Sequence, residues 1–231
     1  MFSPFNPKAI YLDIIVLSLL MQLAGCATPG RTPPSGLTAA EYRQQAYHSI
    51  YEKRYADGTK LLEKAIAIEP RGEDYLLRGD IQEALHQYRA ARSSYQKGQA
   101  TASGDQLNQA LIFHWATLEA LEFNNSAKAA ELALLLPEDS PTALNLQAVQ
   151  AIETNHFDTA LRLTEQITNN TADQEMKGWA YYHAARAWIA VKNKSKAFQS
   201  LFFAINHARG HGLVDRITQL WEELKQQPLA P

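Results

Sequence analysis

The sequence predicts an all-α fold made of about five stacked helix-turn-helix units and a C-terminal capping helix. Three observations lead to this fold. From Thr38 onward the chain is rich in Ala, Leu, Gln, Glu and Lys, which are good helix formers. No stretch alternates apolar and polar residues as a half-buried strand would. Pairs of small residues recur along the same region with their members twelve positions apart, which indicates an internal repeat.

The first 25 residues have the layout of a secretory signal. Lys8 and the N-terminal amine supply positive charge, and residues 14–24 form an apolar segment that is short for a membrane span. The segment runs into a Leu-Ala-Gly-Cys box that ends at Cys26, the only cysteine of 231 residues. This box resembles the signal of bacterial lipoproteins. The alternative is an uncleaved membrane anchor with an incidental cysteine.

The lipoprotein resemblance implies cleavage between Gly25 and Cys26, a diacylglyceryl group on the Cys26 sulfur and an acyl chain on the new amine. Several acyl chains hold a protein on a bilayer almost permanently. Ala27 and Thr28 follow the cysteine, and the lack of an aspartate there favours the periplasmic face of the outer membrane. In a source without an outer membrane, the expected place is the outer face of the cytoplasmic membrane. No other cofactor is expected.

Residues 26–38 are predicted to be a flexible tether after the lipidated cysteine. Three prolines and two glycines between Ala27 and Thr38 prevent regular helix or sheet. Such a segment lifts the helical body, residues 39–227, away from lipid head groups. Thr38 and Glu41 have the spacing of a capping box, which predicts that the first helix starts there.

The recurring small residues predict where two antiparallel helices of each unit approach most closely. Their side chains let the two backbones come near, and the turn falls between the two members of a pair. The pairs are Ala46 and Gly58, Gly79 and Ala91, Thr117 and Ala129, Ala148 and Ala160, and Ala185 and Ala197. Between the second and third units, residues 98–106 are predicted to be an inserted loop.

This pattern resembles the tetratricopeptide repeat (TPR), a helix-turn-helix unit that stacks into a superhelix. The first repeat carries most of the matching positions. They are Tyr42, Ala46, Tyr55, Gly58, Leu62, Ala65 and Pro70. The third repeat matches least, since Ser126 stands where the others have an aromatic or long side chain at the turn. The alternative is an ordinary antiparallel helical bundle with alanine-rich seams.

A last helix is predicted from Leu213 to about Gln226 as a cap on the final repeat. Leu213, Ile217, Leu220, Trp221 and Leu224 share one stripe at helical spacing, which favours core packing. The charged residues of the segment, Arg216 among them, are predicted to lie on the opposite, solvated side.

The TPR resemblance implies a concave surface lined by the first helix of each repeat, and a protein or peptide partner within it. Mixed aromatic, apolar and charged side chains suit an extended peptide or a partner helix. The residues carried over as the partner-binding groove are Arg43, Tyr47, Tyr51, Leu76, Asp80, His114, Leu118, Asn145, Val149, Tyr182 and Arg186. They lack the Lys and Asn set with which some TPR proteins hold a C-terminal carboxylate.

No catalytic motif stands out, so no enzyme activity and no catalytic residue are expected. His207 and His211 are four apart, but Gly210 and Gly212 are expected to break the helix there, so no metal site is predicted. A net charge of −2 argues against a nucleic-acid partner. The first hypothesis is therefore a non-catalytic, membrane-anchored scaffold or assembly factor of an envelope complex, of the kind that serves pili, secretion, outer-membrane assembly or cell-wall enzymes. The alternatives are a cell-wall-active enzyme and a spacer that self-associates through Phe202 and Phe203. Oligomeric state is not predicted.

Overall fold

The computed structural model describes residues 36–226, which are helical throughout apart from short turns and connections. The chain divides into two units, Met1–Leu37 and Thr38–Pro231. The predicted signal, Cys26 and the tether up to residue 35 lie outside the described residues. In residues 36–226 no strand is present, and none of the helices there is long and apolar enough to span a membrane. The predicted all-α class is confirmed.

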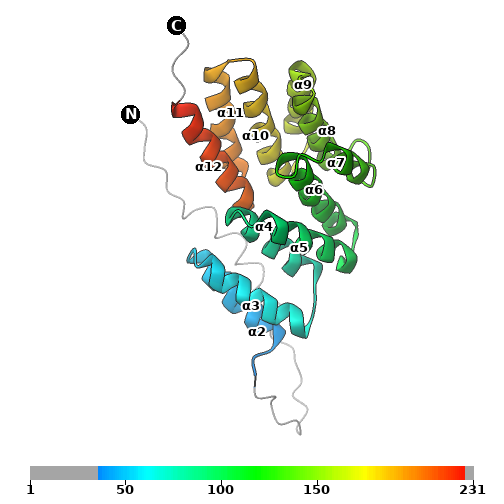
Figure 1. Ribbon diagram of the computed structural model, residues 1–231, viewed down its shortest axis with the longest axis vertical. Helices are drawn as coiled ribbons and strands as arrows, with labels where there is room; N and C mark the ends of the chain where they lie inside the picture. Colours follow the sequence, from blue (N-terminus) through cyan, green and yellow to red (C-terminus); the bar gives the residue numbers. More distant parts are fainter. Residues whose placement is uncertain (1–35, 227–231) are drawn as a thin grey trace. The chain divides into compact units, whose positions relative to one another are not determined.

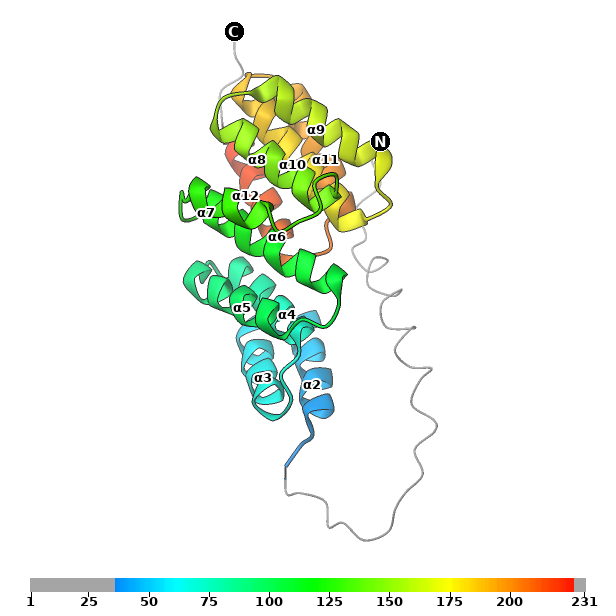
Figure 2. The ribbon, with the colours of Figure 1, turned by 90° about the vertical axis from the view of Figure 1, so that its right-hand side faces the viewer.

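Eleven α-helices form within the described residues, as five antiparallel pairs and a final helix (Figure 1). The pairs are α2 (Ala39–Tyr51) with α3 (Tyr55–Ile68), α4 (Gly72–Ala84) with α5 (Tyr88–Thr101), α6 (Asp105–Leu121) with α7 (Ser126–Ala133), α8 (Pro141–Glu153) with α9 (Phe157–Asn170), and α10 (Gln174–Ala190) with α11 (Lys194–His207). The final helix is α12 (His211–Gln226). Within the repeat unit, successive pairs stack one on the next (Figure 2).

The capping box at the start of the repeat unit is present as predicted. The backbone N–H of Glu41 donates to Thr38 Oγ1 at 3.3 Å, and the N–H of Thr38 donates to a carboxylate oxygen of Glu41 at 2.7 Å. Two N–H groups at the start of α2 that have no intrahelical partner are therefore satisfied.

The five turns inside the pairs share one backbone conformation. In each, the second residue before the second helix has a positive φ, between 49° and 61°. These residues are Lys53, His86, Asn124, Asn155 and Lys192. A residue in the left-handed conformation ends a helix, because the N–H groups that follow it can then bond to the last carbonyls of that helix. Arg54, for example, donates its N–H to the carbonyl of Ser49 at 2.8 Å. The recurrence shows that the five pairs are copies of one structural unit.

Small residues mark the closest helix approaches, as the twelve-residue pairing predicts. Ala46, Ala91, Ala148, Ala160, Ala185 and Ala197 have no exposed surface. Gly79 is the extreme case, since a Cβ added there would overlap the ring of the buried Tyr95. The third pair is irregular because α7 has only 8 residues and Ala129 is half-buried.

The predicted insertion at residues 98–106 is wrong in extent. Helix α5 continues to Thr101 and α6 begins at Asp105, so only residues 102–104 connect them. Gly98 lies inside α5, where an added Cβ would meet a Leu111 side-chain atom at 2.6 Å. The glycine that suggested a loop is there because α5 and α6 pack closely.

The last helix covers the end of the array, and its apolar stripe is confirmed. Leu213, Ile217 and Leu224 are buried in the largest hydrophobic cluster, and Leu220 and Trp221 are partly buried against it. The Trp221 ring meets Phe198 of α11 edge-on at 5.1 Å between centroids. However, α12 starts at His211, so Gly212 lies within the helix rather than breaking it.

Replacing Gly79 by Ala tests the close approach of α4 and α5. Alanine is the better helix former, so without a clash the change would stabilise the protein. Because the Tyr95 ring must move, we expect the free energy of unfolding to fall by about 1–3 kcal/mol in urea titrations. Gly36→Ala is the control, since nothing lies within 4 Å of its added Cβ. An unchanged or higher stability of Gly79→Ala would contradict this packing.

Candidate partner-binding surface

The eleven residues predicted to line a concave groove do not form one exposed surface. Tyr47 and Tyr51 on α2 are 51% and 57% exposed, and Leu76 and Arg186 are half-buried. The other seven are buried, which corrects the prediction that they face a partner. They are Arg43, Asp80, His114, Leu118, Asn145, Val149 and Tyr182.

Arg43 joins the first repeat to the second instead of facing a partner. Its Nε lies 2.9–3.0 Å from both carboxylate oxygens of Asp74, and Nη1 lies 2.9 Å from a carboxylate oxygen of Glu69. Its Nη2 donates to the backbone carbonyl of Glu69 at 2.6 Å. The guanidinium is therefore saturated by the α3–α4 connection and the start of α4, and has a structural role.

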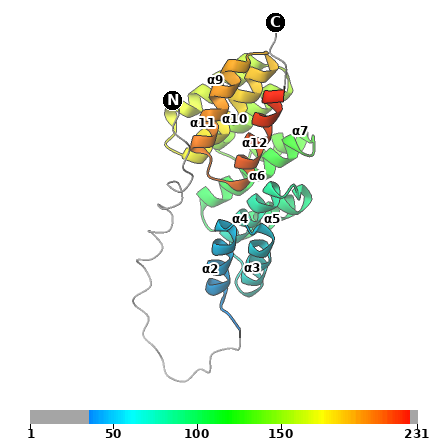
Figure 3. The same ribbon diagram turned by 90° about the vertical axis from the view of Figure 1, so that its left-hand side faces the viewer.

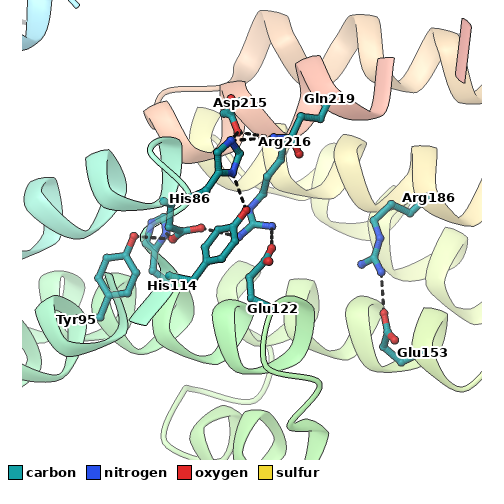
Figure 4. A network of polar contacts seen from close by, with 11 residues as sticks. His86, Tyr95, His114, Glu122, Glu153, Arg186, Asp215, Arg216 and Gln219 are labelled. Carbon is teal, nitrogen blue, oxygen red and sulfur yellow. Dashed lines mark hydrogen bonds and ion pairs between the residues drawn. The ribbon is translucent and has the colours of Figure 1, made fainter. Parts of the chain in front are cut away.

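Other predicted groove residues are core or cross-helix contacts. Leu118 lies in a buried cluster with Tyr95, and Val149 is 2% exposed. The Asn145 side-chain amide donates to the carbonyls of Pro141 at 3.0 Å and Met176 at 3.2 Å, which ties α8 to α10. Arg186 of α10 pairs with Glu153 at the end of α8 at 2.7 Å (Figure 4). These positions therefore make contacts between the first helices of neighbouring repeats.

Of the remaining buried positions, Asp80 lies under α12, which packs against α4 as well as against α10 and α11 (Figures 1 and 3). The Asp80 carboxylate of α4 accepts the backbone N–H of His211 at 2.7 Å and that of Gly212 at 2.8 Å. Asp80 therefore caps the N-terminus of a helix 131 residues further along the chain. A carboxylate suits this place, because the first N–H groups of a helix lack partners and carry partial positive charge.

The Gly210-His211-Gly212 segment is shaped for this contact. A Cβ at Gly210 would lie 2.8 Å from Asp80 Oδ1, and one at Gly212 would lie 2.9 Å from the Glu83 Cβ. Only glycine lets the backbone come this close to α4. The His211 ring packs edge-on against Tyr55 at 5.4 Å between centroids. The two glycines thus serve the approach of α12 to α4.

Arg216 extends the contact between α12 and the repeats. Its Nη2 pairs with Glu83 of α4 at 2.7 Å, and its Nη1 pairs with Glu122 at the end of α6. The Arg216 and Glu83 side chains are 8% and 3% exposed, so this ion pair is buried. Figure 4 shows Arg216 reaching from α12 to Glu122. The prediction that Arg216 lies on the solvated side of the last helix is wrong.

His114 of α6 completes the network below Arg216. Its Nε2 lies 3.2 Å from a Glu175 oxygen on α10, and its Nδ1 lies 3.9 Å from Glu83 Oε1. The Tyr95 hydroxyl donates to the same Glu83 oxygen at 2.6 Å, and its ring stacks on His114 at 5.3 Å. With carboxylates near both ring nitrogens, the doubly protonated imidazolium is the form that fits.

The pKa values in this network follow its charges. Burial lowers the pKa of His114, but its hydrogen bond to Glu175 and the charges of Glu175, Glu83 and Asp80 outweigh this and place it above the ordinary value. Burial raises the pKa of Asp80, against the opposing charges of His211 and His114 and the hydrogen bonds from the α12 backbone. Burial lowers the pKa of Arg216, but Glu83, Tyr182 and Glu122 together more than offset it, so this guanidinium stays charged.

The described residues offer no metal site. Among residues 36–226, no three His, Cys, Asp or Glu side chains are placed to share an ion. His207 ends α11 and His211 begins α12, so the pair does not share one helix. The His207 Nδ1 lies 2.6 Å from the Gln174 side-chain oxygen, and its ring stacks on Tyr181.

Sequence reasoning missed Arg216 and Glu175 as parts of this site. Arg216 follows Leu213 by three residues and precedes Leu220 by four, which is the spacing of the buried stripe itself. That spacing is the sequence signal that Arg216 is buried. No local pattern indicates that Glu175 meets His114, since the two lie 61 residues apart.

Comparison with known proteins supports the fold. No family model matches the chain, and no curated protein matches it. The crystal structure of the APC/C hetero-tetramer Cut9-Hcn1 aligns with a TM-score of 0.57 at 13% identity, over 81% of this chain and 37% of that chain. The chain thus spans 37% of the length of that protein.

Two further solved structures align more loosely. YrrB, described as a TPR protein with an unusual peptide-binding site, gives a TM-score of 0.46 at 17% identity, over 78% of this chain and 92% of that one. A tetratricopeptide repeat protein from Parabacteroides merdae gives 0.34 at 13% identity, over 82% and 93%. The chain has a TPR-like superhelical repeat fold with five helix pairs in residues 36–226.

The His114 network predicts a pH-dependent stability. Because the folded pKa of His114 exceeds the unfolded value of about 6.5, its stabilisation is complete below that pH and is lost as pH rises through the folded pKa. The free energy of unfolding is measured for the wild type and for His114→Gln. We expect the difference, wild type minus variant, to decrease as the pH rises from about 6, near the unfolded pKa, to about 9. The subtraction removes the titration of His183, whose pKa burial lowers. A difference that stays flat with pH would contradict the charged state of His114.

Proposed function

We propose that this protein is a non-catalytic protein–protein interaction scaffold. A stacked array of helix pairs presents an extended surface on which partners can bind along several repeats. The observation that carries the proposal is the pair Tyr47 and Tyr51, which are one helical turn apart on α2 and about half exposed. Tyrosines combine large contact area with a polar hydroxyl and are common anchors of protein interfaces.

We further propose that the scaffold is held on a membrane through Cys26. The basis is the Leu-Ala-Gly-Cys box after an apolar segment, with lipids on the Cys26 sulfur and the new amine. Residues 27–38 would then separate the repeats from the bilayer. The expected site is the periplasmic face of the outer membrane, and the expected role is to hold or assemble an envelope complex.

A self-associating spacer is the second candidate function. Phe202 and Phe203 on α11 are 54% and 37% exposed, and their rings meet edge-on at 5.9 Å. Two adjacent exposed phenylalanines are a candidate contact between copies of the chain.

The test is partner capture by the full-length, acylated protein from envelope membranes. We expect the Tyr47→Ala, Tyr51→Ala double variant to lose at least tenfold of the captured partner, because two exposed aromatic anchors are removed. Cys26→Ala should abolish acyl labelling of the protein, because the thiol that carries the lipid is removed. Tyr182→Ala is unsuitable as a probe, since Tyr182 is buried.

Phe202→Ala is the matched control, because it also removes an exposed aromatic ring. It should leave capture unchanged and, if the spacer hypothesis holds, lower the sedimentation coefficient at high concentration. Equal capture by the wild type and the tyrosine double variant would refute the role of α2. Unchanged acyl labelling and unchanged membrane fractionation of Cys26→Ala would together refute the lipid anchor.

A further inference from the structure

Basic charge is concentrated in the fifth helix pair. Residues 176–214 contain six lysines and arginines and no aspartate or glutamate, although the whole chain has a net charge of −2. The preceding residues 122–175 have the opposite bias, with nine acidic side chains against two basic ones. Two parts of one chain that differ in this way have complementary electrostatic potentials.

An exposed aromatic surface lies within the basic part. Phe202 and Phe203 of α11 are exposed and their rings touch. The Phe203 ring lies 5.2 Å from that of Tyr181 on α10, and Tyr181 stacks on His207 at 5.5 Å between centroids. The four rings therefore form a continuous row across α10 and α11.

A lysine lies at each end of this row. Lys177 precedes Tyr181 by one helical turn, and Lys196 precedes Phe203 by two turns. Because α10 and α11 are antiparallel, the two lysines lie at opposite ends of the row. Neither of them pairs with a carboxylate among residues 36–226, and Lys196 lies over the Trp188 ring at 4.1 Å to the centroid. We call this surface the basic aromatic face, made of Lys177, Tyr181, Lys196, Phe202 and Phe203.

A pair of exposed leucines with acidic neighbours follows α7. Helix α7 ends at Ala133, and Leu134 and Leu135 after it are 86% and 59% exposed. In the described part of the chain, no large apolar side chain is more exposed than Leu134. Glu138 and Asp139 follow on the surface and form no ion pair with any described residue. We call these two leucines and two carboxylates the acidic leucine patch.

We propose that the basic aromatic face of one copy of this protein binds the acidic leucine patch of a second copy. The leucines would pack on the aromatic row, and the lysines at its ends would meet Glu138 and Asp139. An apolar centre with a charged rim is the usual make-up of a protein interface. This inference rests on self-association, the second candidate function, and it names the two surfaces that make the contact.

Such a contact joins copies head to tail, because its two surfaces are different. Figures 1 and 3 show α7 and α11 on different sides of the repeats, so one copy can use both surfaces at once. Each bound copy then offers a free surface to the next, and association continues unless a ring closes. Salt should weaken the contact, because exposed charges are screened over about 8 Å at physiological ionic strength.

The test is sedimentation velocity of the full-length protein at low salt, with detergent micelles in excess. The face variant combines Phe202→Ala with Lys196→Glu, and the patch variant combines Leu134→Ala with Asp139→Lys. We expect the wild type to form species larger than a dimer as its concentration rises, and each variant alone to stay monomeric. An equal mixture of the two variants should form dimers and nothing larger, because only one intact contact can form in it.

The matched control changes the same chemistry at another place. Ile68→Ala combined with Lys60→Glu removes an exposed apolar side chain and reverses an exposed lysine on α3. This control should assemble like the wild type, and about 0.5 M salt should shift both toward the monomer. Circular dichroism checks that every variant keeps its helices.

Several results would overturn the inference. A monomeric wild type would reject it together with the self-association function. Unchanged assembly of both variants would reject the inference alone, since the copies would then associate through another surface. Loss of assembly in only one variant, or a mixture that stays monomeric, would show that the face and the patch do not bind each other.

The capture assay separates these results from the scaffold function. If the wild type is monomeric and the face variant loses the captured partner, the basic aromatic face binds a partner protein and not a second copy. The role of Tyr47 and Tyr51 is measured on other variants, so the scaffold function can stand or fail independently.

Discussion

The contact between α12 and α4 is the constraint on which the rest of the structure depends. Each unit of a repeat array touches its neighbours only, so the stability of such arrays is mostly a sum of local terms. Here Asp80 and Glu83 of the second repeat bind groups more than 130 residues away along the chain. The helix that covers the fifth pair thereby also contacts the second, and through the Arg216–Glu122 ion pair it reaches the third.

The polarity of this contact explains why α12 takes one place only. Buried ion pairs add little net stability, because desolvation offsets much of the attraction, but breaking one partner leaves a costly charge. Asp80 and Glu83 both bind groups of α12, so a shift of α12 along its axis would break both contacts. Apolar contacts such as Leu213 on Gly178 supply the attraction, and the charges select the register.

The sequence predicted local features well and long-range ones poorly. Pairs such as Ala46 and Gly58 follow from packing between adjacent helices, which leaves a periodic pattern in the sequence. The capping box at Thr38 follows from hydrogen bonds within the start of one helix. The predicted groove placed Asp80 and His114 on an exposed surface. Asp80 is buried because α12 folds back over it, and His114 because Glu175 and Trp179 of α10 pack against it. Both are tertiary contacts with no periodic signal. Charge alone predicts that Arg216 is exposed, whereas its spacing places it on the stripe that is buried.

A double-mutant cycle between Glu83 and Arg216 tests the central claim most directly. The free energy of unfolding is measured for the wild type, Glu83→Gln, Arg216→Met and the double variant. If α12 is bound to α4 as described, the two changes should couple by at least about 1 kcal/mol, because residues in one buried network are not additive. Effects that add to within about 0.5 kcal/mol would mean that α12 does not hold the second repeat.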